Sequence, residues 1–537
     1  IDSGRKLTEA GLKLLEISSE NDFTPDNFLQ IPKDSFIYLK QLLKTYNSVD
    51  GETVRPFIIL IKLITEFGYL SSDEYTYLLP LCVSDESTNY IIEKIRELRN
   101  GNISIDEIII SRLMLMENYQ EGLSIFLNND VSAELICEIG MNRKSRRYDM
   151  PYFSLYQCLY QAYMNNDEAA YYSVYEATKN INIGIRWRNY LFNTVSKRAI
   201  SDEPLSCINR TLFNEATNER QFKEAFFKVM HLLKAKATLS DYLDLNRRYI
   251  KTSDVVLFDD SVVKLDIVPK HFFGNIVEDL YEKAFEECDL LFNDCALEDI
   301  AECLITNEAT IINGVNAELG TNITTVEEAR IALNDIRYQR LHTLIEEKFT
   351  DEKLLSLLSY FESRNDDEIR NMVTDNADVP TIFEYVLGIF WYKTSEYKGQ
   401  LLDYMKLSLD ADLLPVTHAA GGEADIVYEY SASENYPEHA LLLEATLADG
   451  TNQRRMEREP VSRHLGSHLL RTGNLNSYCV FATTYLDINV IADFRNRKTT
   501  PFYNTHDYTQ FVNGMKIIPL QTTELKQIII CISLFVY

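Results

Sequence analysis

Leu441-Leu442-Leu443-Glu444-Ala445-Thr446-Leu447 is the segment that identifies the fold class of the C-terminal part of this chain. A short apolar run of this kind, bounded by polar segments, is typical of a buried β-strand. It is surrounded by three further apolar runs and two segments with helical patterning: 426–430, 478–482, 516–520, 376–393 and 455–470. This alternation predicts an α/β domain in which helices flank a small sheet.

One charged residue interrupts the apolar run. Burying the Glu444 carboxylate is costly unless it is paired or bound to a cation, so Glu444 needs a partner. Asp425 opens the preceding strand and Glu457 lies on the following helix, which allows three carboxylates to gather around one point. Mg²⁺ prefers carboxylate oxygens and phosphate, and phosphodiester hydrolysis uses such a site. An acid at a strand end is often only structural, so this spacing alone leaves both interpretations open.

Four short motifs make the interpretation more specific. They are PVTHAAG at 415–421, E-x-T at 444–446, ME-x-EPV-S-RH at 456–464 and KIIPL at 516–520. In this order they closely resemble the nuclease core of the AlwI family of type IIS restriction endonucleases, which includes strand-nicking members. The resemblance spans about 411–520 and extends weakly to Thr8-Glu9-Ala10-Gly11 and to 255–267.

The resemblance implies a metal-dependent endonuclease with a PD-(D/E)XK-like core. By position, the family's metal-site acids would be Asp425, Glu444 and Glu457, with Glu384 as the fourth. The implied cofactor is Mg²⁺, for which Mn²⁺ can substitute. Glu384 has the thinnest local match, and a helix glutamate pointing to water is its alternative.

Residue 446 departs from the wider superfamily, in which a lysine stands two residues after the strand glutamate. Here the residue is Thr446, which we count among the catalytic candidates. Water activation or transition-state charge must then come from elsewhere, and Gln453, Arg454 or Arg463 could supply it.

Two histidines and one further acid lie within the same motifs. His418, also a catalytic candidate, and His464 could contact a phosphate or order water. A lone histidine beside a turn or on a helix is more often structural, so that alternative stays open. Glu459 is either solvated or the ion-pair partner of Arg463.

Charge is distributed unevenly along the chain. The net charge of −28, taken as an average, argues against a nucleic-acid partner. Residues 143–251, however, contain 18 Lys and Arg against 11 Asp and Glu, a net charge of +7, whereas the remainder has 35 against 70. This basic segment predicts a surface for the phosphates of double-stranded DNA. The DNA-binding candidates are Arg143, Lys144, Arg146, Arg147, Arg186, Arg188, Lys197, Arg198, Arg247 and Arg248, with Lys179, Lys234 and Lys236 in support. A solvated loop is the alternative for 143–147.

Two β-branched runs, 255–258 and 262–267, flank the polar turn Asp259-Asp260-Ser261 and predict a β-hairpin. Helices followed by such a hairpin suggest a winged helix, in which a helix enters the DNA groove and the hairpin touches the backbone. A hairpin that merely packs on its helices is the alternative. Residues 276–370 are helical and strongly acidic, so we expect a connector with solvated helix faces.

A chain of 537 residues is expected to form three or four domains. We expect a multidomain, mainly α protein with an α/β C-terminal domain. The expected parts are an N-terminal recognition subdomain (1–135), a basic, winged-helix-like second recognition subdomain (136–275), a helical acidic linker (276–370) and a metal-dependent nuclease domain (371–537). Within the first part, Thr8 is expected to cap a helix and Asn100-Gly101 to end one.

Cysteine usage and hydropathy bear on the compartment. The nine cysteines are scattered without a C-x-x-C pair, so we expect buried thiols in a reducing compartment, the cytoplasm of a bacterium or archaeon. No run of eighteen apolar residues occurs, which predicts no membrane span and no membrane partner. The chain opens at Ile1 without Met and closes near the strand-like run 528–532, so we expect both ends to be cropped.

The leading hypothesis is a type IIS restriction endonuclease of a restriction-modification system. It would bind a short asymmetric site in duplex DNA and cut a fixed short distance outside it. The alternatives are a DNA-binding protein with an inactive nuclease-like domain, and a strand-specific nicking subunit that needs a partner for double-strand cleavage. A second nuclease subunit or a transient self-dimer is therefore a further expected partner. A helical scaffold without a role on DNA is disfavoured by the basic segment and the hairpin.

Overall fold

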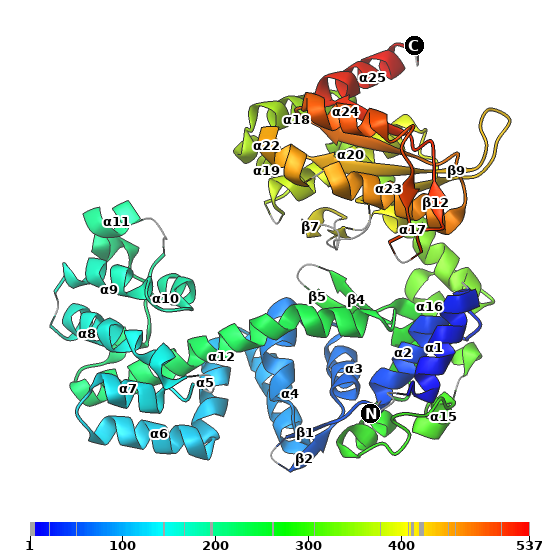
Figure 1. The fold of residues 1–537 in the computed structure, drawn as a ribbon. Helices are drawn as coiled ribbons and strands as arrows, with labels where there is room; N and C mark the ends of the chain where they lie inside the picture. The colour runs from blue at the N-terminus through cyan, green and yellow to red at the C-terminus, as the bar shows by residue number, and fades with distance from the viewer. Residues whose placement is uncertain are drawn as a thin grey trace. The chain divides into compact units, whose positions relative to one another are not determined.

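The computed structural model describes the chain except for residues 1–5, 21, 50, 143–144, 166, 194–196, 260–261, 306, 376, 406, 410–412, 418–423, 449, 457, 506 and 536–537. The fold is mainly helical with small sheets, and the chain divides into two compact units, Ile1–Arg330 and Ile331–Tyr537 (Figure 1). Among the helices of the described part, none combines the length and apolar character that a membrane crossing requires. All nine cysteines are free thiols; five are buried, as expected, three are half-buried and Cys531 is exposed.

The first unit consists of helices and short strands. Its helices are α1 (Glu9–Glu20), α2 (Lys33–Lys44), α3 (Pro56–Phe67), α4 (Asp85–Arg99), α5 (Ile105–Leu115), α6 (Glu117–Asn128), α7 (Ala133–Ile139), α8 (Pro151–Met164), α9 (Ala170–Thr178), α10 (Gly184–Leu191), α11 (Lys197–Asp202), α12 (Glu219–Lys251), α13 (Ile267–Gly274), α14 (Val277–Glu282), α15 (Leu297–Ile300), α16 (Glu308–Leu319) and the start of α17 (Val326–Lys348). Its strands are β1 (Asn47–Val49), β2 (Glu52–Val54), β3 (Leu70–Ser71), β4 (Val256–Asp259) and β5 (Val262–Leu265).

Two predicted helix ends are confirmed. Thr8 Oγ1 accepts a hydrogen bond from the Gly11 N–H at 3.1 Å, so Thr8 caps α1. Helix α4 ends at Arg99, and Gly101 follows with a φ of 74°, a conformation that glycine adopts without strain. Local capping chemistry was therefore sufficient to locate both boundaries.

The predicted hairpin is also confirmed, with a shorter connection than expected. Strands β4 and β5 pair antiparallel, and Asp259 lies opposite Val262, so Asp259 belongs to the strand. The connection is 260–261, which lies outside the described residues. Strand β3 pairs with the other edge of β5, giving the order β3-β5-β4. The sheet therefore joins residues from both segments that we expected to be separate recognition subdomains.

Helix α12 connects two cores of the first unit. Its first half, including Phe222, Phe226 and Met230, is buried in a cluster with α6 to α10. Its second half contacts β4 and the segment that follows β3. One 33-residue helix thus ties the hairpin to the preceding helices.

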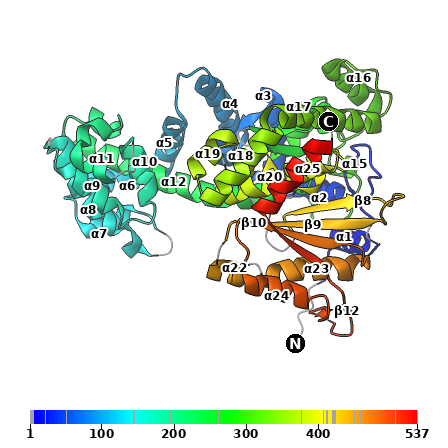
Figure 2. The ribbon, with the colours of Figure 1, turned by 90° about the horizontal axis from the view of Figure 1, so that it is seen from above.

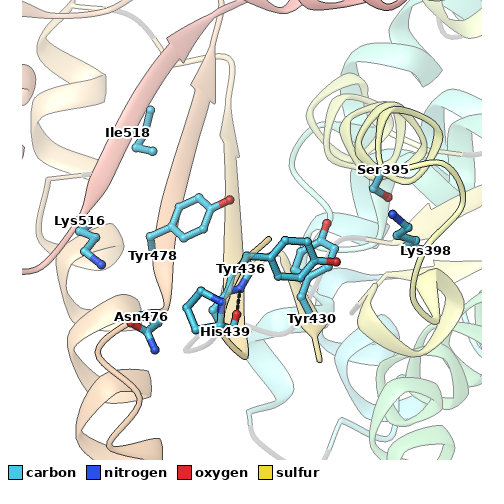
Figure 3. Close-up of a pocket in the computed structure, with 10 residues that line it drawn as sticks. Ser395, Lys398, Tyr430, Tyr436, His439, Asn476, Tyr478, Lys516 and Ile518 are labelled. Atoms are coloured by element: carbon cyan, nitrogen blue, oxygen red, sulfur yellow. Dashed lines mark hydrogen bonds between the residues drawn. The ribbon is translucent and has the colours of Figure 1, made fainter. Parts of the chain in front are cut away.

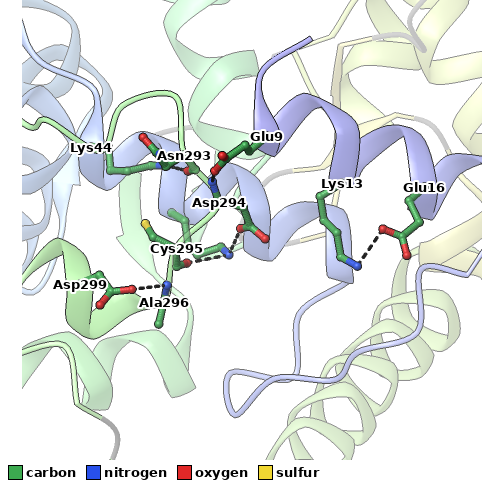
Figure 4. Close-up of polar contacts among 10 residues, drawn as sticks. Glu9, Lys13, Glu16, Lys44, Asn293, Asp294, Cys295, Ala296 and Asp299 are labelled. Atoms are coloured by element: carbon green, nitrogen blue, oxygen red, sulfur yellow. Dashed lines mark hydrogen bonds and ion pairs between the residues drawn. The ribbon is translucent and has the colours of Figure 1, made fainter.

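The acidic segment after residue 276 does not form one connector. Lys44 is buried, and its Nζ donates to the Asn293 carbonyl at 2.6 Å, while Lys40 Nζ lies 2.5 Å from Asp294 (Figure 4). The backbone N–H of Asp294 donates to Glu9. This part of the acidic segment therefore packs on α1 and α2 within the first unit.

The later part of the expected connector belongs to the second unit. Leu341 and Ile345 on α17, and Phe349 directly after it, recur every four residues and are fully buried in the core of the second unit. The boundary between the two units lies at Arg330, inside the segment that we expected to link domains. Charge counts concealed this apolar stripe because the acids lie on the opposite, solvated helix face.

The second unit is an α/β structure. Beyond α17 its helices are α18 (Asp351–Ser363), α19 (Asp366–Met372), α20 (Val379–Thr394), α21 (Leu401–Tyr404), α22 (Gly450–Met456), α23 (Arg458–Thr472), α24 (Ile488–Asn496) and α25 (Thr522–Phe535). Its strands are β6 (Ser408–Leu409), β7 (Pro415–Thr417), β8 (Ile426–Tyr430), β9 (His439–Thr446), β10 (Tyr478–Thr483), β11 (Phe502–Tyr503), β12 (Phe511–Val512) and β13 (Ile517–Gln521).

A four-stranded sheet with the order β13-β10-β9-β8 organises this unit. Strand β9 pairs in parallel with β10 and antiparallel with β8, and β13 pairs in parallel with β10. One face, including Leu441 and Leu443, packs on α17, α18, α20 and α25, and the other, including Leu442, packs on α23 and α24 (Figure 2). The predicted small sheet flanked by helices is confirmed.

The expectation of a strand-like end was wrong. Residues 528–532 lie within helix α25, where Leu525 and Ile529 are buried four residues apart. A short apolar run fits both a strand and one buried helix stripe, and here the adjoining core selects the helix.

The docking of the acidic segment can be tested on Lys44. Lys44→Met should lower the free energy of unfolding by about 1–3 kcal/mol, because a buried hydrogen bond from a charged donor is lost, and should accelerate proteolysis within 286–300. Lys13→Met removes only the exposed ion pair with Glu16 and serves as the control, which should change neither. Urea unfolding and limited proteolysis measure both effects. Unchanged proteolysis in Lys44→Met would contradict the docked arrangement.

Candidate active site

The pairing of β8 with β9 brings two predicted acids together. Ile426 lies opposite Leu443, so extending the register by one residue places Asp425 across from Glu444. Asp425 Oδ2 accepts a hydrogen bond from the Ala445 N–H at 2.8 Å. This bond fixes one carboxylate beside the backbone of the strand that carries the other.

Glu444 is buried, with 6% of its surface exposed. Its neighbours Leu443 and Ala445 point to the α20 side of the sheet, so Glu444 points towards α23. There its Oε1 lies 2.7 Å from Nδ1 of His464. The partner that the buried charge requires is therefore His464.

Burial governs the protonation of this pair. Desolvation raises the pKa of Glu444, and the hydrogen bond from His464 opposes part of that rise. Burial also raises the pKa of the Cys479 thiol, and the carboxylates of Glu444 and Asp425 raise it further. Both carboxylates thus act on the same buried thiol, which indicates that they share one region of the sheet.

His464 has a second nitrogen that the pair does not use. Its side chain is 9% exposed, and Nε2 is buried without a hydrogen-bond partner among the residues that the structure describes. By sequence alone, His464 is a weaker candidate than the acids. The available signal was its place on the α23 stripe with Val461 and Leu465, which directs it to the sheet.

Thr446 and Gln453 have structural contacts. Thr446 Oγ1 accepts from the Ala448 N–H, and Thr446 lies opposite Thr483 on β10. Gln453 is fully buried, and its amide donates to the Ala448 and Tyr485 carbonyls while its oxygen accepts from the Asp487 N–H. These bonds close the loops after β9 and β10, so the Gln453 side chain is engaged in holding both loops.

The two arginine candidates are held by nearby acids. Arg454 Nε lies 3.5 Å from Asp487, and Arg463 Nε lies 3.2 Å from Glu459. The pairing of Glu459 with Arg463 confirms one of the two predicted roles of Glu459. Both arginines retain considerable exposure, so water competes for these ion pairs.

The three remaining candidates are Glu384, His418 and Glu457, and only Glu384 lies among the described residues. Glu384 is half-buried on α20, one turn before Gly388, whose carbonyl accepts the Tyr428 hydroxyl of β8. Helix α20 covers the face opposite α23, so Glu384 comes from the other layer than His464. His418 and Glu457 lie outside the described residues.

The donor set fits a hard divalent cation only in part. Mg²⁺ is commonly held by one or two carboxylates with water and substrate phosphate completing its shell, and Asp425 with Glu444 matches that requirement. Within the described ranges, no group of three His, Cys, Asp or Glu side chains is arranged to hold a metal. The two adjacent carboxylates are therefore the candidate centre.

The basic candidates of the first unit fall into two groups. Arg143, Lys144 and the Arg146 side chain lie outside the described part. Lys234 forms an ion pair with the buried Asp149 at 2.8 Å, and Lys236 forms one with Asp106 at 2.7 Å. The charge of Lys234 is needed inside the fold, because Asp149 is almost fully buried.

The other basic candidates lie nearer to solvent. Arg147, Lys197, Arg198 and Arg248 are exposed, and Arg186, Arg188 and Arg247 are half-buried. Exposed acids lie near some of them: Lys197 and Lys179 contact Glu176, Arg198 contacts Asp202 and Arg248 contacts Asp244. The Arg188 and Arg247 guanidinium groups lie over the rings of Tyr175 and Phe258. The exposed ion pairs with Glu176, Asp202 and Asp244 each contribute about 0–1 kcal/mol to stability, so phosphate can replace these acids.

A cavity of about 660 Å³ lies at the other end of the sheet (Figure 3). Its lining includes His439 and Tyr478, the first residues of β9 and β10, together with Tyr430 at the end of β8. Glu444 is five residues further along β9, or about 17 Å. The cavity is therefore separate from the carboxylate pair.

Comparison with known proteins assigns the family. The family model of the AlwI restriction endonuclease matches residues 2–528. A search of the curated proteins found no match. Among solved structures, the small subunit (R.BspD6I2) of the heterodimeric restriction endonuclease R.BspD6I is similar, with 20% identity and a TM-score of 0.23 over 32% of this chain and 75% of that chain. Because the family match covers nearly the whole chain, the chain belongs to the AlwI restriction endonuclease family and is a nuclease.

Proposed function

We propose that this chain is a type IIS restriction endonuclease. Its first unit binds a short asymmetric site in duplex DNA, and its second unit hydrolyses a phosphodiester bond a fixed short distance outside that site. The observation that carries the proposal is the pairing of β8 with β9, which places Asp425 beside Glu444 in a unit separate from the basic segment 143–251. Separate units allow cutting at a distance from the recognised bases.

The carboxylate pair is proposed to hold Mg²⁺, with Mn²⁺ as a substitute. Bound there, the cation would stabilise charge on the attacking and leaving oxygens of the phosphodiester. The Ala445 N–H orients Asp425, and His464 Nδ1 orients Glu444. We propose Glu457 and Glu384 as further acids of the site, since the family resemblance implies them.

Several cations near the hairpin support a recognition role for the first unit. Arg247 and Arg248 lie in the last turns of α12, which contacts β4. We propose that the three-stranded sheet β3-β5-β4 and α12, which contacts β4, act as a winged-helix-like DNA-reading element. Arg248 is exposed and Arg247 is half-buried, so both can exchange their protein contacts for phosphates.

Metal dependence is the first test of the proposed function. Cleavage of plasmid DNA should stop in EDTA and return with excess Mg²⁺ or Mn²⁺, because the site offers oxygen ligands. Gel analysis of the products also shows whether one strand or both strands of the plasmid are cut. Nicked circles alone would favour the strand-specific nicking subunit, and binding without cleavage would favour the inactive nuclease-like alternative. Cleavage that persists in excess chelator would refute the metal mechanism.

Glu444→Gln tests the centre itself. It should lower cleavage by about a thousandfold or more, since a metal ligand contributes several kcal/mol to the transition state, while DNA binding is retained. Glu429→Gln, which neutralises an exposed carboxylate on the neighbouring β8, is the control and should cut normally. Cleavage rates and binding affinities are measured on the same preparations. Full activity in Glu444→Gln would remove Glu444 from the site.

The same variant has a predicted pH dependence of stability. Because burial raises the pKa of Glu444 above its ordinary 4.5, the folded protein binds this proton more tightly than the unfolded chain. The ionised carboxylate therefore destabilises the fold above the raised pKa, and this cost disappears as the pH falls towards 4.5. Glu444→Gln should melt higher than the wild type at neutral pH, with a difference that shrinks in acid. Thermal melting across pH, without metal, measures this, and a variant that melts lower at neutral pH would contradict it.

DNA recognition is tested on Arg247 and Arg248. Replacing both with Gln should weaken binding about tenfold or more and reduce the salt slope by about 2, because each lost phosphate contact releases one counterion fewer. Arg220→Gln with Lys228→Gln removes the same charge from the other end of α12 and should have little effect. Fluorescence anisotropy over a salt series distinguishes the pairs. Equal effects of the two pairs would place the DNA surface elsewhere.

A further inference from the structure

The second unit has an uneven distribution of charge between its two helical layers. Residues 331–405, which supply α17 to α21, contain 8 Lys and Arg against 14 Asp and Glu. Residues 450–498, which supply α22 to α24 and β10, contain 8 against 4. The layer that covers the Glu444 face is therefore the basic side of an acidic unit. A polyanion approaching this unit is attracted to that layer.

Three cations gather at the end of α24. Arg495 lies in its last turn, and Arg497 and Lys498 follow directly. Arg495 and Lys498 are exposed and Arg497 is half-buried. None of the three forms an ion pair with any residue in the described part of the chain, in contrast to Arg454 and Arg463. Their charge is available to a ligand from solution.

Aromatic side chains are exposed on the adjoining hairpin. Strands β11 and β12 follow α24 directly, and Tyr503 and Phe511 face each other across them with ring centroids 5.6 Å apart. Tyr508, in the connection between the strands, is 76% exposed. Exposed aromatic rings that follow unpaired cations within a few residues of the chain are typical of an interaction site, since neither gains stability in the isolated fold.

The hairpin is anchored to the helix that completes the carboxylate pair. The Phe502 ring packs against Gly466 of α23 so closely that no side chain fits at that position. Gly466 is two residues after His464, which binds Glu444. The cations and the rings thus belong to the layer of the unit that the Glu444 side chain faces.

We propose that Arg495, Arg497 and Lys498, with Tyr503, Tyr508 and Phe511, form a surface that contacts the backbone of duplex DNA outside the recognised site. We call it the α24 surface. It rests on the proposed function, because it positions the DNA that the second unit cuts. The cations bind phosphates and the aromatic rings pack on the sugar edges, so this contact carries no sequence information. Charge complementarity selects DNA rather than a protein partner, because the patch is basic in a chain with a net charge of −28.

The test compares two triple variants of the full chain. Arg495→Gln, Arg497→Gln and Lys498→Gln together should weaken binding to a fluorescent duplex about tenfold or more and lower the salt slope by about 2–3. The control, Arg337→Gln, Lys353→Gln and Arg370→Gln, removes equal charge from the acidic layer of the same unit and should leave affinity and slope unchanged. Equal effects of both triples, or no effect of the α24 triple, would overturn the proposal.

Two further measurements separate the possible causes. Exchanging the charges conservatively, as Arg495→Lys, Arg497→Lys and Lys498→Arg, should restore the affinity, and thermal melting reports whether each variant folds. Loss of binding that the charge-retaining variant does not rescue would overturn a phosphate-contact role. Cleavage by the wild type in Mg²⁺ is scored independently of binding. A chain that binds DNA through the α24 surface but never cuts would refute the proposed function and leave this surface standing.

Discussion

Strand β9 is the constraint on which the nuclease unit depends. It is hydrogen-bonded on both sides, to β8 and β10, and apolar on both faces, so its position in the sheet is fixed. A one-residue slip would turn Glu444 from the α23 layer to the α20 layer and expose its neighbours to the wrong core. The pairing that stabilises the sheet is therefore the same pairing that sets Asp425 across from Glu444.

Burying a carboxylate in this strand has a consequence for α23. The charge is tolerated because His464 meets it at 2.7 Å, and His464 can do so because Val461, Leu465 and Leu469 hold α23 against the sheet. The second ring nitrogen of His464, Nε2, is buried and has no hydrogen-bond partner among the described residues. Helix α23 thus packs on the sheet and also orients the His464 side chain. The Phe502 ring of the β11–β12 hairpin packs on the same helix, against Gly466.

Much of this arrangement followed from local sequence. The strands at 426–430 and 478–482 were predicted within one residue, because a short apolar run between turns is a strong signal for a buried strand. The β4–β5 hairpin was predicted for the same reason. The terminal run 528–532 predicts a strand but forms part of a helix, because five apolar residues are too few to distinguish a strand from the buried stripe of a helix. The acidic segment was misjudged because exposed acids outnumber the few apolar residues, such as Leu341 and Ile345, that decide where a helix packs.

The residues that could carry the chemistry are evident from the sequence: an acid within an apolar strand, a second acid at the start of the preceding strand, and the motifs of one family around both. The sequence also shows that the buried acid needs a partner, since an isolated charge is not stable in a core. The three-dimensional fold is needed to identify His464 as this partner. It also shows that Gln453 holds two loops, that Lys234 pairs with a buried aspartate, and that Arg495, Arg497 and Lys498 have no ion pair among the described residues. The physical reason is that hydrogen bonds and ion pairs are short-range, so they depend on which helices meet in space, and sequence spacing alone does not fix that.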